Sequence, residues 1–489
     1  MRFRSLVLLV VVVGVAAMAV RPSFDTDTWW HLRAGQWIVE NRQAPRIDTF
    51  SSTMRGSAWA YPGWLAQVVM LGFYRLGGLA GLTAFSAVLV GVAFLFLWPL
   101  LEGPLLLRAA ILLLAAATSA VYWAARPHIA SFALAAFFLW ALDQWRRGRR
   151  PRVIWLLPLA MALWVNLHGG FAIGFILLLM YFGAALVDIV AVPVRHKGTW
   201  GKVWRVQRGE IATLAAVLLL CLAAGAVNPH GPAILAYPFK TVSLPVLQSY
   251  VQEWQPPDLR TPQLLPFLGM LLFLIAALGI SRTAATTTEL FTAGGWMALA
   301  LLAVRNVPVF ALAAAPVIAR HTSAALRSVA GGPALGNTVR EKRALNAALG
   351  AGLLILLLAW TAVQAGPGRT RAHLGAQVPV AAVQAMRELS PNGNLFNDYN
   401  WGGYVLWELS PAYATFVDGR TDVFSAEVFE DYLLLWAAQP GWGAAIERWN
   451  IAMVLLPPRS PLVAALREAG WEARFSDDQA VVLLRPRSG

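Results

Sequence analysis

The apolar run "LVLLVVVVGVAAMAV" (6–20) leads directly into "RPSFDTDTWWH" (21–31), a polar segment with two aspartates. A helix needs roughly 20 mostly apolar residues to cross the hydrocarbon core of a membrane. The basic start "MRFR" also resembles that of a cleaved signal peptide. No clean small-residue cleavage site precedes the acidic segment, however, and many more apolar runs follow. We therefore expect a first transmembrane helix that places Asp25 and Asp27 at its outer end.

The composition of the chain is that of a membrane protein. Its 489 residues are 58% hydrophobic and only 13% charged, whereas soluble domains carry about 25% charged residues. The net charge of +14 comes from basic residues that lie mostly between apolar runs, so it indicates membrane topology and not a nucleic-acid partner. The single cysteine, Cys221, excludes an intrachain disulfide and a cysteine metal site.

Basic clusters predict the cytoplasmic loops, because cytoplasmic loops carry an excess of Lys and Arg. The clusters are "MRFR" (1–4), "RRGRRPR" (146–152), "RHKGTWGKVWRVQR" (195–208) and "REKR" (340–343). An even number of crossings between them gives about eleven transmembrane helices, near 5–21, 82–101, 107–124, 129–145, 153–167, 170–192, 211–228, 263–281, 288–304, 307–320 and 344–364. Residues 63–78 contain Gln67 and Arg75, and we expect them to form a helix along the outer surface.

The last part of the chain predicts a separate small α/β domain. We expect residues 1–365 to form the transmembrane domain, with a first outer loop at 22–81, and residues 366–489 to form a soluble periplasmic domain. The N-terminus is then cytoplasmic. Expected strands are "NLFND", "ATFVDG", "IAMVLLP", "EARFS" and "AVVLLRP", and expected helices lie near 379–390, 425–437 and 460–470.

Six polar clusters fall on the outer side in this topology. They are "DTDTWWH" (25–31), "ARPH" (125–128), "NLHGG" (166–170), "NPHG" (228–231), "EW" (253–254) and "RN" (305–306). Polar residues at membrane depth are costly and tend to line cavities. The clusters therefore predict one functional site on this face.

The two aspartates of the first loop allow different chemistry. A carboxylate pair one residue apart can hold a divalent cation through oxygen ligands, or one carboxylate can take a proton from an attacking hydroxyl. Asp27 also precedes the amphipathic stretch "TWWHLRAGQWIVEN" (28–41), where it can act as a helix N-cap.

Several side chains at outer helix ends can bind a phosphate. Arg126 and Arg305 can each clamp one, or can anchor at the membrane interface. Three histidines can bind phosphate oxygens or a metal, or can pack at helix ends: His128, His168 and His230.

Two other places can contact an acceptor. Glu253 and Trp254 lie in the long outer loop 229–262 and can meet an acceptor or make plain loop contacts. The segment "FVDGRTDVFS" (416–425) contains Asp418, Arg420 and Asp422, and an Asp–Arg pair there can fix a turn at a strand end, or the segment can recognise an acceptor.

These features together resemble the GT-C glycosyltransferases, polytopic membrane enzymes that use lipid-phosphate-linked sugars. The pattern is similar to a bacterial group of that superfamily without an assigned substrate. The matching pieces are "DTDTWWHLRAGQWI", "P-x-x-D-T-F-S" (45–51), "WL" (64–65), "ARPH", "NLHGGF", "NPHG", "EW", "WGGYVLW" (401–407) and "VDGRTDVF" (417–424).

The resemblance implies a role for each of these residues. Asp25 would be the catalytic base at the acceptor, and Asp27 would bind a metal or organise the donor phosphate. The donor-phosphate ligands would be Arg126 and Arg305, with His128, His168 and His230, and the acceptor would meet Glu253 and Trp254. Metal use varies in the superfamily, so a divalent cation, Mg or Mn, is left open.

The implied function is sugar transfer on the periplasmic face of the bacterial inner membrane. The donor would be a polyprenyl-phosphate-linked sugar, and the acceptor a glycan, a lipid or a protein. Two alternatives remain: a transporter or flippase for a lipid-linked sugar, and an inactive assembly protein with the GT-C fold. A transporter favours polar residues near mid-membrane and broken helices in repeated halves. The gathering of polar clusters on one side favours the enzyme.

Overall fold

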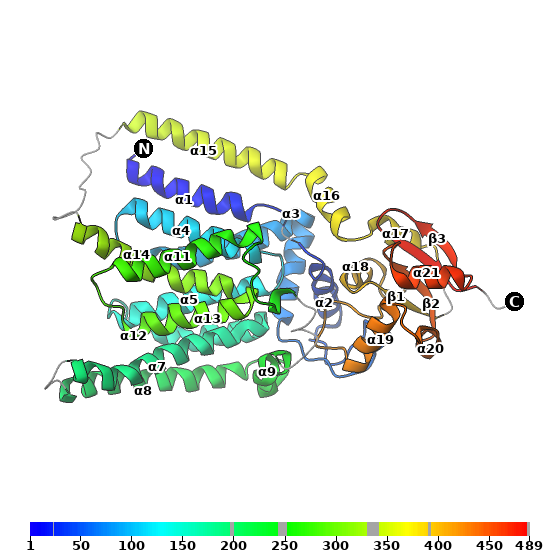
Figure 1. Cartoon of the computed structure of the whole chain (residues 1–489), viewed down its shortest axis with the longest axis horizontal. Coiled ribbons are helices and arrows are strands. Elements are labelled where there is room, and N and C mark those ends of the chain that lie inside the picture. Colours follow the sequence, from blue (N-terminus) through cyan, green and yellow to red (C-terminus); the bar gives the residue numbers. More distant parts are fainter. Residues whose placement is uncertain (23, 196–199, 243–251, 330–341, 390–392, 487–489) are drawn as a thin grey trace. The chain divides into compact units, whose positions relative to one another are not determined.

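A computed structural model describes the chain except for residues 23, 196–199, 243–251, 330–341, 390–392 and 487–489 (Figure 1). The chain folds into two compact units. The helical unit comprises Met1–Ser23, Thr83–Pro238 and Gln248–Ala365, and the C-terminal unit comprises Phe24–Leu82, Phe239–Leu247 and Gly366–Gly489. The predicted division assigned the first outer loop, 22–81, to the transmembrane domain. In the structure almost all of this loop belongs to the same unit as the C-terminal residues.

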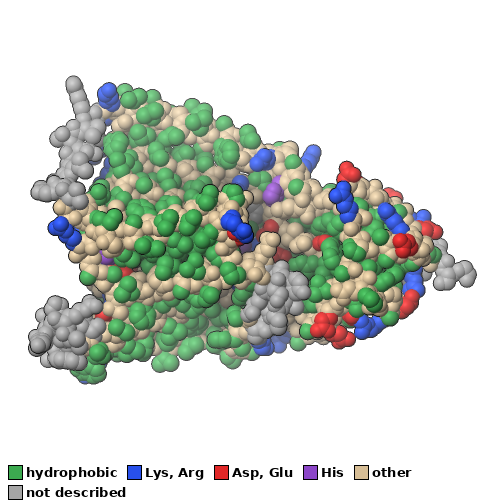
Figure 2. Space-filling model, viewed as in Figure 1, with side chains coloured by type: hydrophobic (Ala, Val, Ile, Leu, Met, Phe, Trp, Pro, Cys, Tyr) green, Lys and Arg blue, Asp and Glu red, His purple; other side chains and the backbone are tan. Residues whose placement is uncertain are grey.

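The helical unit is a bundle of long apolar helices. Its main elements are α1 (Phe3–Ala19), the second part of α3 (Trp64–Leu97), α4 (Leu105–Ser119), α5 (His128–Arg146), α6 (Leu157–Leu167), α7 (Ala172–Arg195), α8 (Trp200–Gly225), α11 (Leu265–Ile280), α12 (Thr287–Glu289), α13 (Gly295–Leu302), α14 (Val307–Val329) and α15 (Arg343–Gln364). Every one of the eleven predicted spans overlaps a helix or a run of helices. Hydrophobic side chains cover most of the visible face of this unit (Figure 2).

Seven stretches of the described chain are long and apolar enough to cross a membrane. They are Trp64–Leu100, Leu105–Tyr122, Gly169–Val190, Val206–Gly225, Pro262–Ile280, Val304–Ser328 and Arg343–Gln364, and Phe3–Ala19 and Val153–Leu167 are shorter apolar helices. The chain is thus a polytopic α-helical membrane protein, as predicted. The count of eleven crossings stays a prediction.

Helix α3 is interrupted at two glycines. Gly77 has φ −145° and ψ 15°, and Gly78 has φ 56° and ψ −136°. The positive φ at Gly78 is readily adopted only by glycine. The break separates the segment expected along the surface, 63–78, from the apolar helix that follows it. The surface position of this segment stays a prediction.

The C-terminal unit contains a four-stranded sheet in the order β1-β2-β4-β3. Strand β1 (Asn394–Asn397) is parallel to β2 (Ile451–Leu456), and β4 (Val481–Leu484) is antiparallel to both β2 and β3 (Glu472–Ser476). The helices of the unit are α2 (Thr28–Asn41), the first part of α3, α16 (Pro367–Gln377), α17 (Val380–Met386), α18 (Tyr399–Leu409), α19 (Ala426–Trp436), α20 (Trp442–Arg448) and α21 (Pro461–Glu468).

One predicted strand is wrong. The segment "ATFVDG" (414–419) makes only an isolated bridge, between Ser51 and Thr415, and then bends. Its polar groups bond to side chains instead of to a neighbouring strand: Asn397 Oδ1 accepts the Phe416 N–H at 2.9 Å, and Asn397 Nδ2 donates to the Val417 carbonyl at 2.8 Å. The other four predicted strands and the three predicted helices are present.

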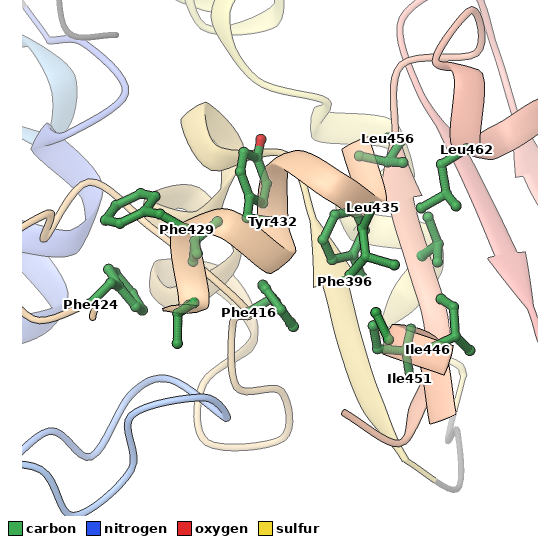
Figure 3. Close-up of a cluster of buried hydrophobic side chains, with 14 of the residues drawn as sticks. Phe396, Phe416, Phe424, Phe429, Tyr432, Leu435, Ile446, Ile451, Leu456 and Leu462 are labelled. Carbon is green, nitrogen blue, oxygen red and sulfur yellow. The ribbon is translucent and has the colours of Figure 1, made fainter. Parts of the chain in front are cut away.

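The hydrophobic core of the C-terminal unit lies between the sheet and α19 (Figure 3). Phe396 on β1, Leu435 on α19 and Ile451 on β2 are fully buried there. The same core includes Trp30, Phe50 and Trp59 from the first outer loop. The first loop and the C-terminal residues therefore fold as one hydrophobic unit.

Candidate functional site

A cationic cluster lies where helices of the helical unit begin. Arg126 lies just before α5, Arg305 just before α14, and His168 just before the short helix Gly169–Phe171 that leads into α7. Helix α5 packs against both α7 and α14. The N-terminus of a helix carries a partial positive charge and unpaired N–H groups, which suits an anion. These helix starts therefore add to the charge of the two arginines.

The two arginines are held by the outer loop 252–255. Arg126 Nη1 lies 3.7 Å from Glu253 Oε2, and the guanidinium of Arg305 lies 4.0 Å from the ring centroid of Trp254. The loop is tied to the start of α14, because the Val304 N–H donates to the Gln255 carbonyl at 3.0 Å. Four of the five predicted residues of "ARPH", "EW" and "RN" thus come together in pairs, Arg126 with Glu253 and Arg305 with Trp254.

Glu253 experiences both arginine charges. Burial alone would raise the pKa of this carboxyl group, but the charges of Arg126 and Arg305 outweigh burial and hold the pKa below its ordinary value. Glu253 is therefore an anion, and it offsets one of the two cations. The cluster keeps a net positive charge of one, which can attract a phosphate.

A short chain of hydrogen bonds determines the protonation of His168. Trp164 Nε1 donates to Ser131 Oγ at 2.7 Å, and the Ser131 hydroxyl lies 2.8 Å from His168 Nδ1. The Gly170 N–H also donates to this nitrogen, at 3.0 Å. Since Nδ1 accepts these bonds, the ring proton lies on Nε2. His168 can then donate Nε2–H to an oxygen of a ligand.

His128 is buried beside this ring. Its side chain is only 4% exposed, its Nε2 lies 2.7 Å from the Tyr122 carbonyl, and its ring centroid lies 6.3 Å from that of His168. The carbonyl can only accept, so Nε2 carries the proton. Within the described part of the chain, His128 Nδ1 has no hydrogen-bond partner.

The turn that carries His230 is joined to the turn before His168. Asn228 Nδ2 donates to the Val165 carbonyl at 2.9 Å, and Asn166 Nδ2 donates to the Val227 carbonyl at 2.6 Å. The His230 N–H donates to Asn228 Oδ1 at 3.0 Å. These bonds bring "NLHGG" and "NPHG" together, as the sequence predicts. A ligand role for His230 stays a prediction.

The acidic segment belongs to the C-terminal unit, where Asp25 caps α2. Oδ1 of Asp25 accepts the N–H groups of Asp27 and Thr28 at 3.1 and 3.2 Å, and its own N–H donates to Thr28 Oγ1 at 2.9 Å. Asp27 is the residue before the helix but makes no capping bond with its side chain. The alternative of Asp27 as the cap is therefore wrong. The capping carboxylate is that of Asp25, two residues earlier, which accepts the N–H groups of Asp27 and of Thr28, the first residue of the helix.

The Asp27 carboxylate points to a turn of the C-terminal residues. A Cβ atom added to Gly419 would lie 1.9 Å from Asp27 Oδ1 and 2.8 Å from Trp30 Nε1. The absence of a side chain at Gly419 therefore allows residues 27–30 and the turn around residue 419 to approach each other this closely.

The described residues do not form a metal site by themselves. Among them, no group of three or more His, Cys, Asp or Glu side chains is placed to hold a metal ion. Asp25 and Asp27 are two carboxylates, one of which already accepts backbone N–H groups through Oδ1. Magnesium is commonly bound by one or two carboxylates together with substrate phosphates. A metal ligand role for Asp27 would therefore require ligands from the substrate.

Two supporting residues were not identified from the sequence. Ser131 follows His128 by three residues on α5 and orients the His168 ring, and Tyr122 supplies the carbonyl that fixes His128. The spacing of Ser131 puts it on the same helix face as His128, which is a usable signal. Nothing in the local pattern indicates Tyr122.

Comparisons with known proteins show a shared fold. No protein-family model matches the chain, and no curated protein does. The archaeal oligosaccharyltransferase AglB from Archaeoglobus fulgidus, solved in complex with an inhibitory peptide and a dolichol-phosphate, is similar with a TM-score of 0.56 and 13% identity, over 92% of this chain and 69% of that chain. Its apo form gives 0.54 and 14%, with the same coverage. ArnT from Cupriavidus metallidurans bound to undecaprenyl phosphate gives 0.48 and 15%, over 99% and 98%.

The likeness to AglB confirms the predicted fold class. It extends over nearly the whole chain, and so includes both units. At this identity it is a likeness of architecture: the chain has the GT-C fold.

Proposed function

We propose that the chain is a GT-C-type glycosyltransferase that transfers a sugar from a polyprenyl-phosphate-linked donor to a glycan, lipid or protein acceptor. The observation that carries this proposal is the cationic cluster of Arg126 and Arg305 at helix starts, with its net positive charge. Shared architecture adds support, because the AglB structure with this fold holds a dolichol-phosphate and a peptide.

The cluster matches the charge that develops in sugar transfer. The bond from the sugar to the donor phosphate breaks through an oxocarbenium-like state, and negative charge collects on the departing phosphate. Arg126 and Arg305 would stabilise that charge with charge-assisted hydrogen bonds. His168 would add a neutral donor through Nε2–H. Apolar helices beside the cluster would accommodate the polyprenyl chain.

The acidic segment would activate the acceptor. Asp25 is the proposed base, and the two backbone N–H groups on its Oδ1 fix the orientation of the carboxylate while Oδ2 can take a proton from the acceptor hydroxyl. Asp27 would organise the donor phosphate, directly or with a divalent cation.

The loop residues Glu253 and Trp254 also position the two arginines, in addition to the acceptor contact predicted for them. Their contacts are to the two arginines, so we assign them to holding those side chains in place. The acceptor contact predicted for them stays a prediction. We place the reaction on the periplasmic face of the inner membrane, with a cytoplasmic N-terminus.

Binding of farnesyl phosphate, a short polyprenyl phosphate, to the purified full chain tests this function. Wild type should bind it more tightly than farnesol, because the phosphate supplies the contact with the cluster. Arg305→Ala should weaken binding about ten- to hundred-fold, since a charged hydrogen bond contributes about 1.5–3 kcal/mol. Arg305→Lys should recover only part of this loss, because lysine keeps the charge but lacks the planar guanidinium that donates two parallel hydrogen bonds to a phosphate.

The matched control is Arg260→Ala. Arg260 lies in the loop that also contains Glu253 and Trp254, and its side chain is 92% exposed and paired with Asp258, so its loss should not change binding. Equal affinity for the phosphate and the alcohol, or equal losses in Arg305→Ala and Arg260→Ala, would contradict the proposed phosphate site.

A further inference from the structure

Three sequence motifs have no part in the proposed chemistry, yet all lie around the acidic segment. They are "PRIDTFS" (45–51), "WGGYVLW" (401–407) and "VDGRTDVF" (417–424). The C-terminal unit contains all three together with "DTDTWW" (25–30). Their contacts show what they do for Asp27.

The turn of "VDGR" (417–420) touches Asp27 directly. Gly419 has no side chain, and a Cβ atom there would lie 1.9 Å from Asp27 Oδ1. Real Cβ atoms do not approach an oxygen this closely. The indole nitrogen of Trp30 would lie 2.8 Å from the same Cβ and is buried without a hydrogen-bond partner among the described residues. The backbone at Gly419 therefore forms one wall of the space that the Asp27 carboxylate occupies.

A buried ion triad holds this turn rigidly. Arg420 donates through Nε and Nη2 to the two oxygens of Asp418, at 2.8 and 2.7 Å, and through Nη1 to Asp48 Oδ1 at 2.5 Å. All three side chains are fully buried. The Arg420 guanidinium also lies 5.0 and 4.9 Å from the rings of Phe50 and Trp59. The turn cannot move without separating buried charges, which is costly.

The first outer loop bonds to the same turn along its backbone. The Ser52 N–H donates to the Thr415 carbonyl at 2.8 Å, and Thr53 Oγ1 donates to the Phe416 carbonyl at 2.7 Å. The Asp48 carboxylate in turn accepts the N–H of Phe50 at 3.0 Å. Asp48 of "PRIDTFS" and the two residues that follow this motif, Ser52 and Thr53, therefore hold residues 415–420 from the side of the first loop.

Helix α18 packs against both the acidic segment and the turn. A Cβ atom at Gly403 would lie 2.7 Å from the Thr26 carbonyl, and one at Gly402 would lie 2.4 Å from the Val417 carbonyl. The two adjacent glycines of "WGGY" thus let α18 pack tightly on both the acidic segment and the turn. Residues 25–30 thus lie against "WGGYVLW" and "VDGRTDVF", and "PRIDTFS" holds the second of these motifs through Asp48 and Arg420.

From this geometry we infer that Gly419, held by the Asp418–Arg420–Asp48 triad, is a positioning residue for the Asp27 carboxylate. The role of the C-terminal residues is then to complete the site in the first outer loop, and not to act as a separate acceptor-binding module. The consequence for transfer rests on the proposed function. The contact between Gly419 and Asp27 does not depend on it.

A double-mutant cycle on the full chain tests the contact without any substrate. Gly419→Ala should lower the apparent melting temperature in detergent by a few degrees, because the methyl group meets Asp27 Oδ1. In an Asp27→Ala background the same change should cost distinctly less, since the nearest oxygen is gone. Part of the decrease in melting temperature should remain, because the added methyl group also meets Trp30 Nε1. An equal loss in both backgrounds, or no loss in either, would overturn the inferred contact.

Two control variants separate positioning from general destabilisation. Gly443→Ala adds a methyl group in α20 where nothing lies within 4 Å of it, so it should not lower the melting temperature and can raise it slightly. Val482→Ala removes buried methyl groups from β4, which lies in the core of the sheet, and should lower the melting temperature without touching Asp27.

The surface-glycan profile of a deletion strain that carries each variant gives the functional readout. At comparable membrane levels, Gly419→Ala should restore the profile far less than Val482→Ala does, and it should add nothing to the defect of Asp27→Ala. Equal restoration by Gly419→Ala and Val482→Ala would reduce Gly419 to a structural role and overturn the inference. A deletion strain with an unchanged glycan profile contradicts the proposed function, while the melting cycle still decides the contact.

Discussion

The Arg420 guanidinium donates through Nη1 to Asp48 Oδ1 at 2.5 Å and so joins two positions 372 residues apart in the chain. Asp48 belongs to the first outer loop and Arg420 to the C-terminal residues, and both are fully buried. Burial alone would raise the pKa of Asp48, but the charge and hydrogen bond of Arg420, together with the hydrogen bonds from Ser51 and Phe50, outweigh burial and hold the pKa below its ordinary value. This pair makes the folding of the first loop depend on the C-terminal residues.

Loss of this arginine should be severe. Arg420→Met would leave the carboxylates of Asp48 and Asp418 buried without a cation, which typically costs about 3–5 kcal/mol. Thermal or denaturant unfolding of the full chain measures the loss. Arg485→Ala, which removes an exposed ion pair with Glu447, is the control and should cost no more than about 1 kcal/mol. Similar losses in the two variants would mean that the buried triad contributes no more than a surface pair.

Replacing each aspartate of the acidic segment should separate catalysis from folding. Asp25→Asn keeps an oxygen to cap α2 but cannot take a proton at neutral pH, so transfer should fall about 10²- to 10⁴-fold in a normally folded chain. Asp25→Ala should also lose the cap, at about 1 kcal/mol of stability. Asp27→Asn should weaken donor or metal binding, and added divalent cation should partly restore it if a metal is used.

The glycan profile of complemented cells and the melting temperature together measure these effects. The prediction fails if Asp25→Asn and Asp27→Asn both restore the profile as well as wild type does. The acidic pair would then be structural, and the transferase proposal would lose its main catalytic residues.

Asp398 should make the stability of the chain depend on pH. Burial raises the pKa of this carboxyl group from 3.8 to about 6. The folded chain thus binds the proton more tightly than the unfolded chain, so stability should increase as the pH falls from about 7 to 4 and decrease as it rises through 6. Asp398→Asn keeps an acceptor for the Asn400 N–H, which now donates at 2.7 Å.

This variant should be more stable than wild type at pH 7.5 by roughly 2 kcal/mol, and about equal near pH 4. Melting temperatures of both proteins across this range provide the measurement. Parallel pH profiles for wild type and Asp398→Asn would show that Asp398 titrates normally.

Glu253→Gln should strengthen binding of farnesyl phosphate by a few-fold. The change removes the anion that pairs with Arg126, so the cluster gains positive charge. The gain should shrink as salt is raised, because screening weakens the attraction. Weaker binding at every salt concentration would instead mean that Glu253 is needed to orient Arg126.

The position of residue 79 tests the predicted topology. Leu79→Cys in a Cys221→Ala background should react with a membrane-impermeant thiol reagent in intact cells, because residues 63–78 are expected to lie along the outer surface. Cys221 is the only native cysteine, so its replacement leaves the cysteine introduced at position 79 as the single thiol that the reagent can label. Labelling that appears only after lysis would refute the eleven-span topology.

The sequence by itself determined the features that depend on local composition. Apolar length predicted the helices, and short apolar runs predicted five strands, of which four are present. Basic clusters suggested which helix ends face the same side. That reasoning also brought Arg126, His128, His168 and Arg305 into one hypothesis, because the predicted topology puts all four at helix ends on the same side of the membrane.

Only the tertiary structure decided which segments that are far apart in the chain contact one another. Nothing local in "DTDTWW" indicates that Gly419 must be a glycine, because its missing side chain matters only where Asp27 approaches it. The assignment of the first loop to the C-terminal unit likewise follows from the pairing of Asp48 with Arg420. Contacts of this kind depend on chain closure over hundreds of residues, which neither hydrophobic periodicity nor charge patterning encodes.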